Sequence, residues 1–342
     1  MPHSARISIV VNNHNYATFL PAAIDSALAQ TRAAGEVIVV DDGSTDASRD
    51  VIASYGDRVR PLFKENGGQA SALNAGFAAC RGDAVLFLDA DDALRPTALE
   101  AVAGVWRDGV AKVQFPLEVV DRDGRPLGYR APKAPMPSGD VSATVLAVGV
   151  YPSPPTSGNV FSRRALERLM PMAETHLSPD GHLIQASALL GDVVTIPEPL
   201  GAFRVHGGNN WALERELRPA RLRQIAVSEE QKAAALRELG ARIGVSVPAD
   251  LALRVPDHLQ ARLASLRVEP GTHPYAGDGG WALAAKGIRA CWRTPSYPLR
   301  KKLLFSGWFV ALAASRGRLS RALASACYVP ARRPRLLRAV VG

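Results

Sequence analysis

The chain has 342 residues, of which 47% are hydrophobic and 21% charged, so it can form one large or two ordinary globular domains and is not globally disordered. The net charge of +9 is uneven: 13 Lys and Arg and no Asp or Glu lie from Lys286 onward, against 28 basic and 32 acidic residues before it. This distribution argues against a nucleic-acid-binding function inferred from overall charge.

Cysteine content and apolar run lengths indicate the compartment. Three scattered cysteines (Cys80, Cys291 and Cys327) argue against a disulfide framework or a zinc site. The longest apolar run, residues 305–314, has half of the roughly 20 residues that a membrane-spanning helix needs. The run at residues 7–11 is too short for the core of a signal peptide. We therefore expect a cytoplasmic protein.

The first hundred residues alternate between strand and helix patterns. Continuous apolar runs predict strands at residues 6–11, 36–40, 58–63 and 84–88. Apolar residues at helical spacing predict helices near residues 20–28, 51–55 and 69–80. Such alternation with short connections predicts an α/β fold with a mostly parallel sheet covered by helices on both faces.

The pattern changes after Trp106. Alternating apolar residues at 113–119, followed by Asp121-Arg122-Asp123-Gly124, predict a strand and a hairpin turn. Further strands are predicted at 159–161, 193–196 and 199–205, and helices at 141–148, 163–170 and 183–190. Beyond Trp211 the chain is predicted to be mainly helical, ending in an amphipathic helix from Leu304 to Leu323.

Two predicted strands end in clusters of carboxylates. The run 36–40 is followed by Asp41 and Asp42, and the run 84–88 by Asp89-Ala90-Asp91-Asp92. Ligands bind at the carboxyl ends of strands in parallel sheets, and crowded carboxylates attract a cation. An acidic turn closed by its own side chains is the structural alternative. No Gly-x-Gly-x-x-Gly follows the first strand and no Gly-x-x-x-x-Gly-Lys occurs, so Rossmann cofactor and P-loop sites lack their phosphate-binding turns.

A set of ordered segments resembles glycosyltransferase family 2. They are Ser8-Ile9-Val10-Val11, Val39-Val40-Asp41-Asp42-Gly43-Ser44-Thr45-Asp46, Asn66-Gly67-Gly68, Asn74-Ala75-Gly76, Gly82-Asp83 and Phe87-Leu88-Asp89-Ala90-Asp91-Asp92. The resemblance spans roughly residues 6–210. It implies a GT-A fold, with a Rossmann-like, mostly parallel sheet, and an inverting, metal-dependent transfer from a nucleotide-diphospho-sugar. We expect a domain at 1–213, with a nucleotide-sugar half (1–105) and an acceptor half (106–213), then a helical region at 214–342.

The resemblance implies roles for both acidic clusters. It places Asp41 or Asp42 against the nucleobase, where a carboxylate can accept a hydrogen bond from a ring N–H, and we favour Asp42. An Asx turn or helix cap, which Ser44 or Asp46 could supply, is the alternative. Asp89 and Ala90 are expected at the ribose or the metal. Asp91 is expected to bind Mn²⁺ or Mg²⁺, because hard cations prefer carboxylate and phosphate oxygens. Asp92 supports that site or caps a helix that starts near Pro96.

Polar residues after the first and third strands complete the expected donor site. Asn12, His14 and Tyr16 are candidates for the wall of the base pocket, with an ordinary polar turn as the alternative. Lys64 and Asn66 are candidates for contact with the nucleotide, with a solvated turn as the alternative.

The expected acceptor half supplies the base. An inverting transfer needs a group that takes the proton of the acceptor hydroxyl. The resemblance points to Asp180, in Ser178-Pro179-Asp180-Gly181-His182, although Asp180 as a helix N-cap is the structural alternative. Glu174 is the reserve. Arg204 resembles part of a segment that closes over the diphosphate, and His206 is expected to bind metal or phosphate.

The resemblance suggests an acceptor hydroxyl on a glycan or lipid-linked glycan in surface polysaccharide synthesis. The basic C-terminal region is either a solvated face or a peripheral contact with anionic lipid at the inner face of the cell membrane. Two other functions compete. A sugar-phosphate nucleotidyltransferase would need a Gly-rich, basic phosphate loop where this chain has Asn-Asn-His-Asn. A non-catalytic, membrane-associated sugar-nucleotide-binding protein would not need the Asp89, Asp91 and Asp180 set.

Overall fold

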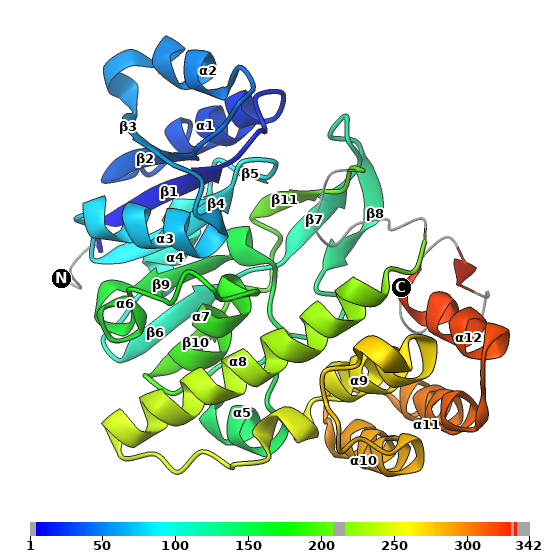
Figure 1. Cartoon of the computed structure of the whole chain (residues 1–342). Coiled ribbons are helices and arrows are strands. Elements are labelled where there is room, and N and C mark those ends of the chain that lie inside the picture. The colour runs from blue at the N-terminus through cyan, green and yellow to red at the C-terminus, as the bar shows by residue number, and fades with distance from the viewer. Residues whose placement is uncertain (1–4, 208–215, 330–331, 334–342) are drawn as a thin grey trace. The chain divides into compact units, whose positions relative to one another are not determined.

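The computed structural model describes residues 5–207, 216–329 and 332–333, and Figure 1 labels its elements. The chain divides into two compact units. The first, called here the sheet unit, comprises Met1–Ser142 and Pro152–Val205, and the second, the helical unit, comprises Ala143–Tyr151 and His206–Gly342. The domain boundary predicted at residue 213 lies outside the described residues.

The sheet unit contains a seven-stranded sheet with the order β10-β6-β9-β4-β1-β2-β3. Its strands are β1 (Ile7–Asn13), β2 (Glu36–Asp42), β3 (Arg60–Lys64), β4 (Ala84–Asp89), β6 (Val110–Gln114), β9 (Asn159–Ser162) and β10 (Asp192–Thr195). Strands β3, β2, β1 and β4 are parallel, whereas β9 runs antiparallel to both β4 and β6. The predicted mostly parallel sheet is confirmed.

A smaller sheet and a set of helices complete this unit. The second sheet has the order β5-β11-β7-β8, from β5 (Ala93–Leu94), β11 (Gly201–Arg204), β7 (Leu117–Val120) and β8 (Pro126–Ala131). The helices are α1 (Leu20–Leu28), α2 (Ser48–Ser54), α3 (Gly68–Ala79), α4 (Ala98–Val105), α6 (Arg163–Leu169) and α7 (Pro179–Ser187), with short 3₁₀ turns η1 (Gly56–Arg58) and η2 (Thr156–Gly158).

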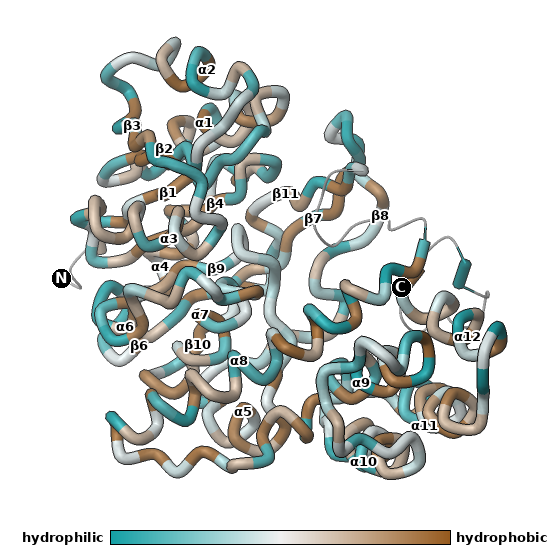
Figure 2. The backbone as a smooth tube through the Cα atoms, viewed as in Figure 1, coloured by the Kyte–Doolittle hydropathy of each residue, from teal (hydrophilic) through white to brown (hydrophobic). Residues whose placement is uncertain are grey.

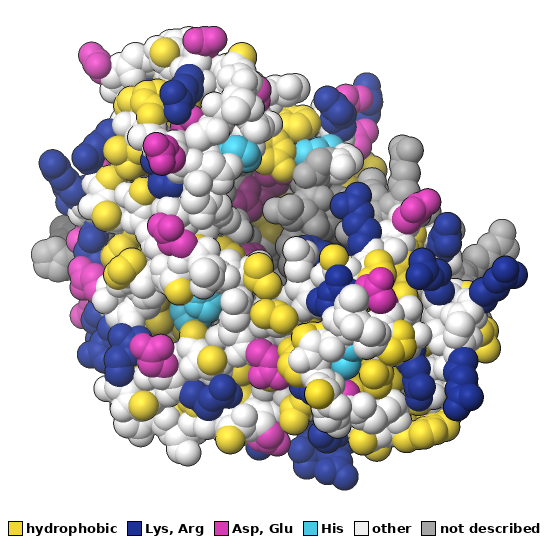
Figure 3. All heavy atoms as spheres, viewed as in Figure 1, with side chains coloured by type: hydrophobic (Ala, Val, Ile, Leu, Met, Phe, Trp, Pro, Cys, Tyr) yellow, Lys and Arg dark blue, Asp and Glu magenta, His cyan; other side chains and the backbone are white. Residues whose placement is uncertain are grey.

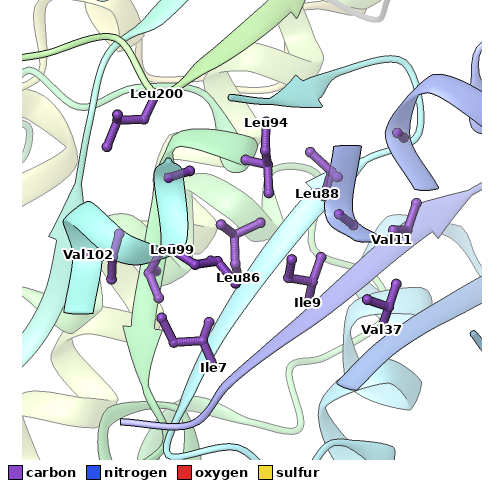
Figure 4. Packing of buried hydrophobic residues seen from close by; sticks show 14 of the residues in the cluster. Ile7, Ile9, Val11, Val37, Leu86, Leu88, Leu94, Leu99, Val102 and Leu200 are labelled. Atoms are coloured by element: carbon purple, nitrogen blue, oxygen red, sulfur yellow. The ribbon is translucent and has the colours of Figure 1, made fainter. Parts of the chain in front are cut away.

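The two faces of β1 pack against different helices, because successive side chains of a strand point to opposite sides. On one face Ile7, Ile9 and Val11 lie in a fully buried cluster with residues of β2, β4, α1 and α4 (Figure 4). On the other face α3 approaches so closely that a Cβ on Gly76 would lie 2.3 Å from Val10 Cγ1. The continuous apolar run in β1 therefore reflects burial on both faces, as predicted.

Two elements differ from the prediction. The alternating run at 113–119 is two strands, β6 and β7, which belong to different sheets. Pro116 lies between them, and a residue without a backbone N–H is poorly suited to the interior of a strand. The predicted helix from Leu304 to Leu323 is likewise two helices, which are separated at residues 315–317.

The helical unit contains α8 (Pro219–Ile243), η3 (Leu251–Arg254), α9 (Pro256–Val268), η4 (Pro270–Thr272), α10 (Gly280–Arg293), α11 (Leu299–Ala314), α12 (Arg318–Tyr328) and nearly all of α5 (Ser142–Val148). Hydrophobic and hydrophilic residues alternate along α8 (Figure 2), and its buried residues include Leu222, Leu236 and Leu239. Within the described part of the chain, no helix combines the length and apolar character needed to cross a bilayer. The predicted helical C-terminal region is confirmed.

Candidate active site

The register of the central sheet brings the two acidic clusters to one edge. At the carboxyl ends of the parallel strands, Asn12 of β1 is paired with Asp89 of β4, and Asn13 of β1 is paired with Asp41 of β2. Asp42 is paired in turn with Lys64 of β3. The sequence placed acidic residues after two strands, and the strand order β4-β1-β2 makes both ends neighbours of β1.

Two asparagines at the end of β1 hydrogen-bond to both clusters. Asn12 Nδ2 donates to Asp89 Oδ1 at 2.9 Å, and Asn13 Nδ2 donates to Asp41 Oδ1 at 3.0 Å. Asn12 was a candidate for the nucleotide site, and its side chain bonds to Asp89 of the second cluster. Asn13 was missed, although its place in a run of polar residues directly after a buried strand was a usable signal.

The carboxylate of Asp42 organises the loop between β3 and α3. Its Oδ1 accepts from Lys64 Nζ at 2.6 Å and from the Gly67 N–H at 3.0 Å, while its Oδ2 accepts from the Gly68 N–H at 2.8 Å. The Asp42 side chain is 4% exposed. Lys64 and the Asn66-Gly67-Gly68 turn therefore lie directly beside Asp42, and the nucleobase role of Asp42 stays a prediction.

Asp41 is held by a different set of donors. Its side chain is fully buried, and Arg49 Nε lies 3.2 Å from its Oδ2. The same oxygen accepts from the Ser44 N–H at 3.3 Å, so Asp41 closes the turn that follows β2. Asp46 supports the start of α2 by accepting from the Ser48 N–H at 2.9 Å. The Asx-turn alternative thus applies to Asp41 and Asp46, whereas the N-cap of α2 is Ala47.

The polar turn after β1 meets the turn after β3. His14 Nδ1 lies 2.8 Å from the Asp42 carbonyl oxygen, and Asn66 Nδ2 lies 3.1 Å from His14 Nε2. Asn15, which was missed, has φ of 60° and accepts from the Thr45 N–H at 2.7 Å. Its type and place were a signal, because asparagine tolerates left-handed backbone. Both His14 and Asn66 are exposed, as a ligand-contacting surface requires.

The second cluster concentrates negative charge in a buried place. Burial, and then the charge of Asp91, raise the pKa of Asp89 to about 7. Burial and the charges of Asp91 and Asp89 also raise the pKa of Asp92 well above its usual range. Burial followed by the same carboxylates raises the pKa of Tyr16 to about 12, so Tyr16 lies beside this cluster. Ala90 is buried between the acids, and its N–H donates to the Asn12 carbonyl at 3.2 Å.

Asp92 joins the acidic turn to two other elements. Its Oδ2 accepts from Ser157 Oγ of η2 at 2.6 Å, and its Oδ1 accepts from the Arg204 N–H of β11 at 3.0 Å. The alternative role of Asp92 as a helix cap is wrong, because α4 has Thr97 at its N-cap. Arg204 lies against the same turn, since its Nε donates to the Asp91 carbonyl at 2.9 Å.

The short turn η2 contributes residues that were missed. Besides its bond to Asp92, Ser157 Oγ accepts from the Asp89 N–H at 3.1 Å. The hydroxyl of Thr156 is hydrogen-bonded to the Asp89 side chain and favours its charged form. The only sequence signal was a Ser/Thr pair in a Pro-rich loop just before a strand, and β9 brings this loop beside β4.

Asp180 lies in the first turn of α7, near the second cluster. Its negative charge is among the causes that raise the pKa of Asp89. Asp180 is not the N-cap, which is Ser178, so that alternative is wrong. Ser178 Oγ donates to Asp180 Oδ1 at 3.0 Å and orients the carboxylate.

Helix α3 fixes the segment that leads to α7. Asn74 exchanges two hydrogen bonds of 2.8 Å with the backbone of Met172. Ser71 Oγ donates to Glu174 Oε1 at 2.7 Å, so Glu174 is exposed but already bonded to α3. Asp180 is favoured over Glu174 as the base because the charge of Asp180 acts on Asp89, and the role stays a prediction for both.

The part of the sequence that builds this site matches a known protein family. The model of the family described as "Glycosyl transferase family 2" matches residues 8–169, which include both acidic clusters and the strands that carry them. This match assigns residues 8–169 to a family 2 glycosyltransferase domain. The matched residues include the candidates from Asn12 to Asp92 and end before Asp180, Arg204 and His206.

Two bacterial relatives support this assignment. An uncharacterised glycosyltransferase of Nostoc sp. is 39% identical over 60% of this chain and 66% of its own length. The succinoglycan biosynthesis protein ExoO of Rhizobium meliloti is 33% identical over 58% of this chain and 60% of its own length. The matched part thus spans less than two-thirds of these relatives.

Solved structures share the fold. TarS 1–349 of S. aureus, in complex with UDP-GlcNAc, has a TM-score of 0.54 and 15% identity, covering 94% of this chain and 91% of that one. The mannosyltransferase PcManGT of Pyrobaculum calidifontis, in complex with GDP-Man and Mn²⁺, has a TM-score of 0.50 and 19% identity, covering 95% and 85%. Together these likenesses confirm a GT-A fold for this chain.

The predicted metal site involves Asp89, Asp91 and His206. His206 is buried and belongs to the helical unit, so its metal role stays a prediction. Among the described residues, no three His, Cys, Asp or Glu side chains are grouped so as to hold an ion. Both carboxylate oxygens of Asp92 accept hydrogen bonds, and Asp89 and Asp91 stay the predicted ligands in the sheet unit.

Proposed function

We propose that the sheet unit is an inverting glycosyltransferase that moves a sugar from a nucleotide-diphospho-sugar, with UDP-sugars favoured, to a hydroxyl of a glycan or lipid-linked acceptor. The observation that carries this proposal is the grouping of Asp180 with the Asp89–Asp91 turn at the carboxyl ends of parallel strands. One acid can serve the acceptor hydroxyl while the others serve the leaving group, and the transfer needs both functions.

The residues at the second cluster fit a divalent cation. A buried turn whose carboxylates raise each other's pKa is stabilised when a positive charge binds beside it. Since the described residues offer two carboxylates rather than three ligands, the ion would take its other ligands from the donor diphosphate and water, as Mg²⁺ commonly does. Mn²⁺ or Mg²⁺, when bound, supplies Lewis-acid stabilisation of the leaving diphosphate.

The chain's own residues would perform the remaining steps. The carboxylate of Asp180 accepts the proton of the acceptor hydroxyl while that oxygen forms a bond to the anomeric carbon. The bond from this carbon to the diphosphate oxygen breaks on the opposite face, so the nucleoside diphosphate leaves with the electron pair and the configuration inverts. Ser178 holds Asp180 in place through its 3.0 Å bond.

The first cluster is proposed to form the nucleoside pocket. Asp42 fixes Lys64 and the glycine turn, and exposed His14 and Asn66 lie beside them, where a uracil ring or a ribose could bind. The complex of TarS with UDP-GlcNAc makes UDP-sugars the first donors to test. The name of ExoO, a succinoglycan biosynthesis protein, makes a surface polysaccharide the first class of acceptor to consider.

A transfer assay tests the proposal. The full chain is incubated with UDP-GlcNAc, UDP-glucose, UDP-galactose or GDP-mannose, with and without Mn²⁺, and nucleoside diphosphate release is measured. We expect metal-dependent release with one donor, and Asp180→Asn should lower turnover about 100-fold or more while donor binding persists. Asp108→Asn, at an exposed loop position, is the matched control and should retain activity.

Three results would contradict the proposed function or its base assignment. Normal transfer by Asp180→Asn would assign the base elsewhere, with Glu174→Gln as the next variant to test. Release of pyrophosphate from a nucleoside triphosphate and a sugar phosphate would identify a nucleotidyltransferase instead. Binding of a sugar nucleotide without any turnover would identify a non-catalytic binding protein.

A further inference from the structure

Helix α10 exposes an apolar stripe on the helical unit. Trp281, Ile288 and Trp292 are spaced seven and four residues apart, which places them on one side of a helix. Trp281 is 60% exposed and Trp292 is 48% exposed, and Ile288 is half-buried. The opposite side of α10, with Leu283 and Cys291, is buried in the core of the unit. Trp281 and Trp292 are therefore additional to the face that α10 needs for folding, whereas Ile288 also packs against the edge of that core.

Helix α11 has the same arrangement. Leu299, Leu303 and Val310 are 60%, 56% and 45% exposed, and they lie four and seven residues apart on one side. The opposite side contributes Trp308 and Leu312 to the buried core. Trp308 and Leu312 therefore pack inside the unit, while a different apolar stripe of the same helix is exposed.

Two contacts show that the stripes adjoin. Trp292 Nε1 of α10 donates to Ser306 Oγ of α11 at 3.1 Å, and Ser306 lies between Leu303 and Val310 on the exposed side. A Cβ on Gly287 would lie 2.2 Å from a ring carbon of Phe309, so the two helices are in close contact. Exposed apolar surface of this extent on neighbouring helices is typical of an interaction site.

The side chains around the two stripes are positively charged, which indicates the kind of partner that could bind there. Lys286, Arg289 and Arg293 follow one another on the exposed flank of α10, and Lys302 Nζ lies 6.0 Å from the ring centre of Trp292. From Gly279 to Val329 the chain has nine Lys and Arg and no Asp or Glu. Figure 3 shows hydrophobic and basic side chains close together on the surface of this unit.

This combination favours an anionic bilayer over other partners. Tryptophan is enriched at membrane interfaces, and cationic side chains beside an apolar stripe bind anionic headgroups. A second copy of the same surface would bring cations against cations. A nucleic acid would use the basic residues but would leave exposed leucine and valine side chains without a role.

We propose that the surface formed by Trp281, Ile288, Trp292, Leu299, Leu303 and Val310 lies in the headgroup layer of an anionic membrane. The purpose of this contact, which is to hold the enzyme beside a membrane-borne acceptor, rests on the proposed function. Binding to the membrane itself does not depend on sugar transfer.

Vesicle co-sedimentation of the full chain tests the surface. We expect binding to vesicles of phosphatidylcholine with about one third phosphatidylglycerol to be at least about tenfold tighter than to phosphatidylcholine alone, and to weaken with salt. A triple variant, Leu299→Ser with Leu303→Ser and Val310→Ser, should bind at least about tenfold more weakly. A second variant, Lys286→Gln with Arg289→Gln and Arg293→Gln, should lose the preference for anionic lipid.

The matched control is Leu127→Ser with Tyr129→Ser, which removes exposed apolar side chains of β8 in the sheet unit and should bind as the wild type does. All changed positions are exposed, so the melting temperature should be unchanged. Binding of the triple serine variant at wild-type strength would overturn the inference. Self-association that is lost in this variant, with no vesicle binding by either protein, would assign the surface to a second copy and also overturn it.

The same assay separates this inference from the proposed function. Asp180→Asn should bind vesicles normally, and the triple serine variant should keep its turnover of the donor in solution. Vesicle binding without sugar transfer by the wild type would remove only the proposed function. Sugar transfer without vesicle binding would remove only the membrane surface.

Discussion

The two acidic strand ends look alike in the sequence but differ in how their charge is balanced. Asp41 and Asp42 follow β2, and their carboxylates face the guanidinium of Arg49 and the ammonium of Lys64. Asp89 and Asp92 follow β4, and the groups that hold them are neutral: the Asn12 amide, the Ser157 hydroxyl and the Arg204 backbone N–H. The carboxylates of the first end are paired with cations, whereas burial and neighbouring carboxylates raise the pKa values of Asp89 and Asp92 at the second end.

Position at a strand end therefore does not decide the role of a carboxylate. A carboxylate with internal cations and N–H donors stabilises the loop that it binds. A buried carboxylate among like charges is held in an unfavourable state, and such a state is typical of functional sites. A change from aspartate to asparagine should therefore affect the two ends differently: mainly stability at the first end and mainly activity at the second.

The largest expected effect is on activity at the second end. Asp91→Asn should lower kcat/KM at saturating Mn²⁺ by about 10²–10⁴-fold, because it removes a charged ligand candidate of the ion that stabilises the leaving diphosphate. Steady-state kinetics over a range of Mn²⁺ concentrations would measure this loss. Unchanged kinetics and metal dependence would show that the cluster is not a metal site.

The next effect is on stability at the first end. Asp42→Asn should lower the free energy of unfolding by about 1–3 kcal/mol, because it removes the ion pair with Lys64 and weakens the bonds from the Gly67 and Gly68 N–H groups. Urea denaturation in metal-free buffer would measure it. In the same buffer Asp91→Asn should cost less stability than Asp42→Asn, since it removes the repulsion that Asp91 exerts on Asp89 and Asp92. If both variants lost a similar free energy of unfolding, the two ends would not differ in how their charge is balanced.

The third effect is a pH dependence of the metal-free protein. Burial and then Asp91 raise the folded-state pKa of Asp89 from 3.8 to about 7, so the folded state binds the proton more tightly than the unfolded chain does. Stability from this group is therefore present below about pH 4 and is lost as the pH rises through about 7.

Thermal melting between these pH limits would measure the loss. Asp91→Asn should reduce the slope, because the charge of Asp91 is the second cause of the shift. Asp57→Asn, at an exposed position in η1, is the control and should follow the wild type. Equal slopes in all three proteins would show that the carboxylates of the second end do not interact in the folded state.

The sequence predicted the strands, their carboxyl ends and most of the charged residues at this edge. Apolar runs and helical spacing are local properties, and the runs before Asp41 and Asp89 were long enough to be clear. The partners of those carboxylates were not predictable in the same way. Ser157 reaches Asp92 because β9 pairs antiparallel with β4 and brings a distant loop to the turn.

The buried side of helix α11 could not be predicted from the sequence, for a related reason. Its sequence has apolar residues on two sides, and only tertiary packing decides which side is buried. Trp308 and Leu312 pack inside, while Leu303 and Val310 are exposed. A pattern of spacing identifies the stripes of a helix but not the neighbour that covers each of them.

The smallest expected effect is that of removing the charge of Arg49, the exposed cation at the first end. Arg49 is 55% exposed, so its ion pair with Asp41 is screened, and Arg49→Gln should change the free energy of unfolding by less than about 1 kcal/mol. Asp41 keeps its bonds from Asn13 and from the Ser44 N–H, which are buried. Asn13→Ala is the matched comparison and should be the more destabilising change when both are measured by urea denaturation, because it removes a buried donor. A larger loss in Arg49→Gln than in Asn13→Ala would mean that the charge of Arg49, rather than the buried hydrogen bonds, balances the first end.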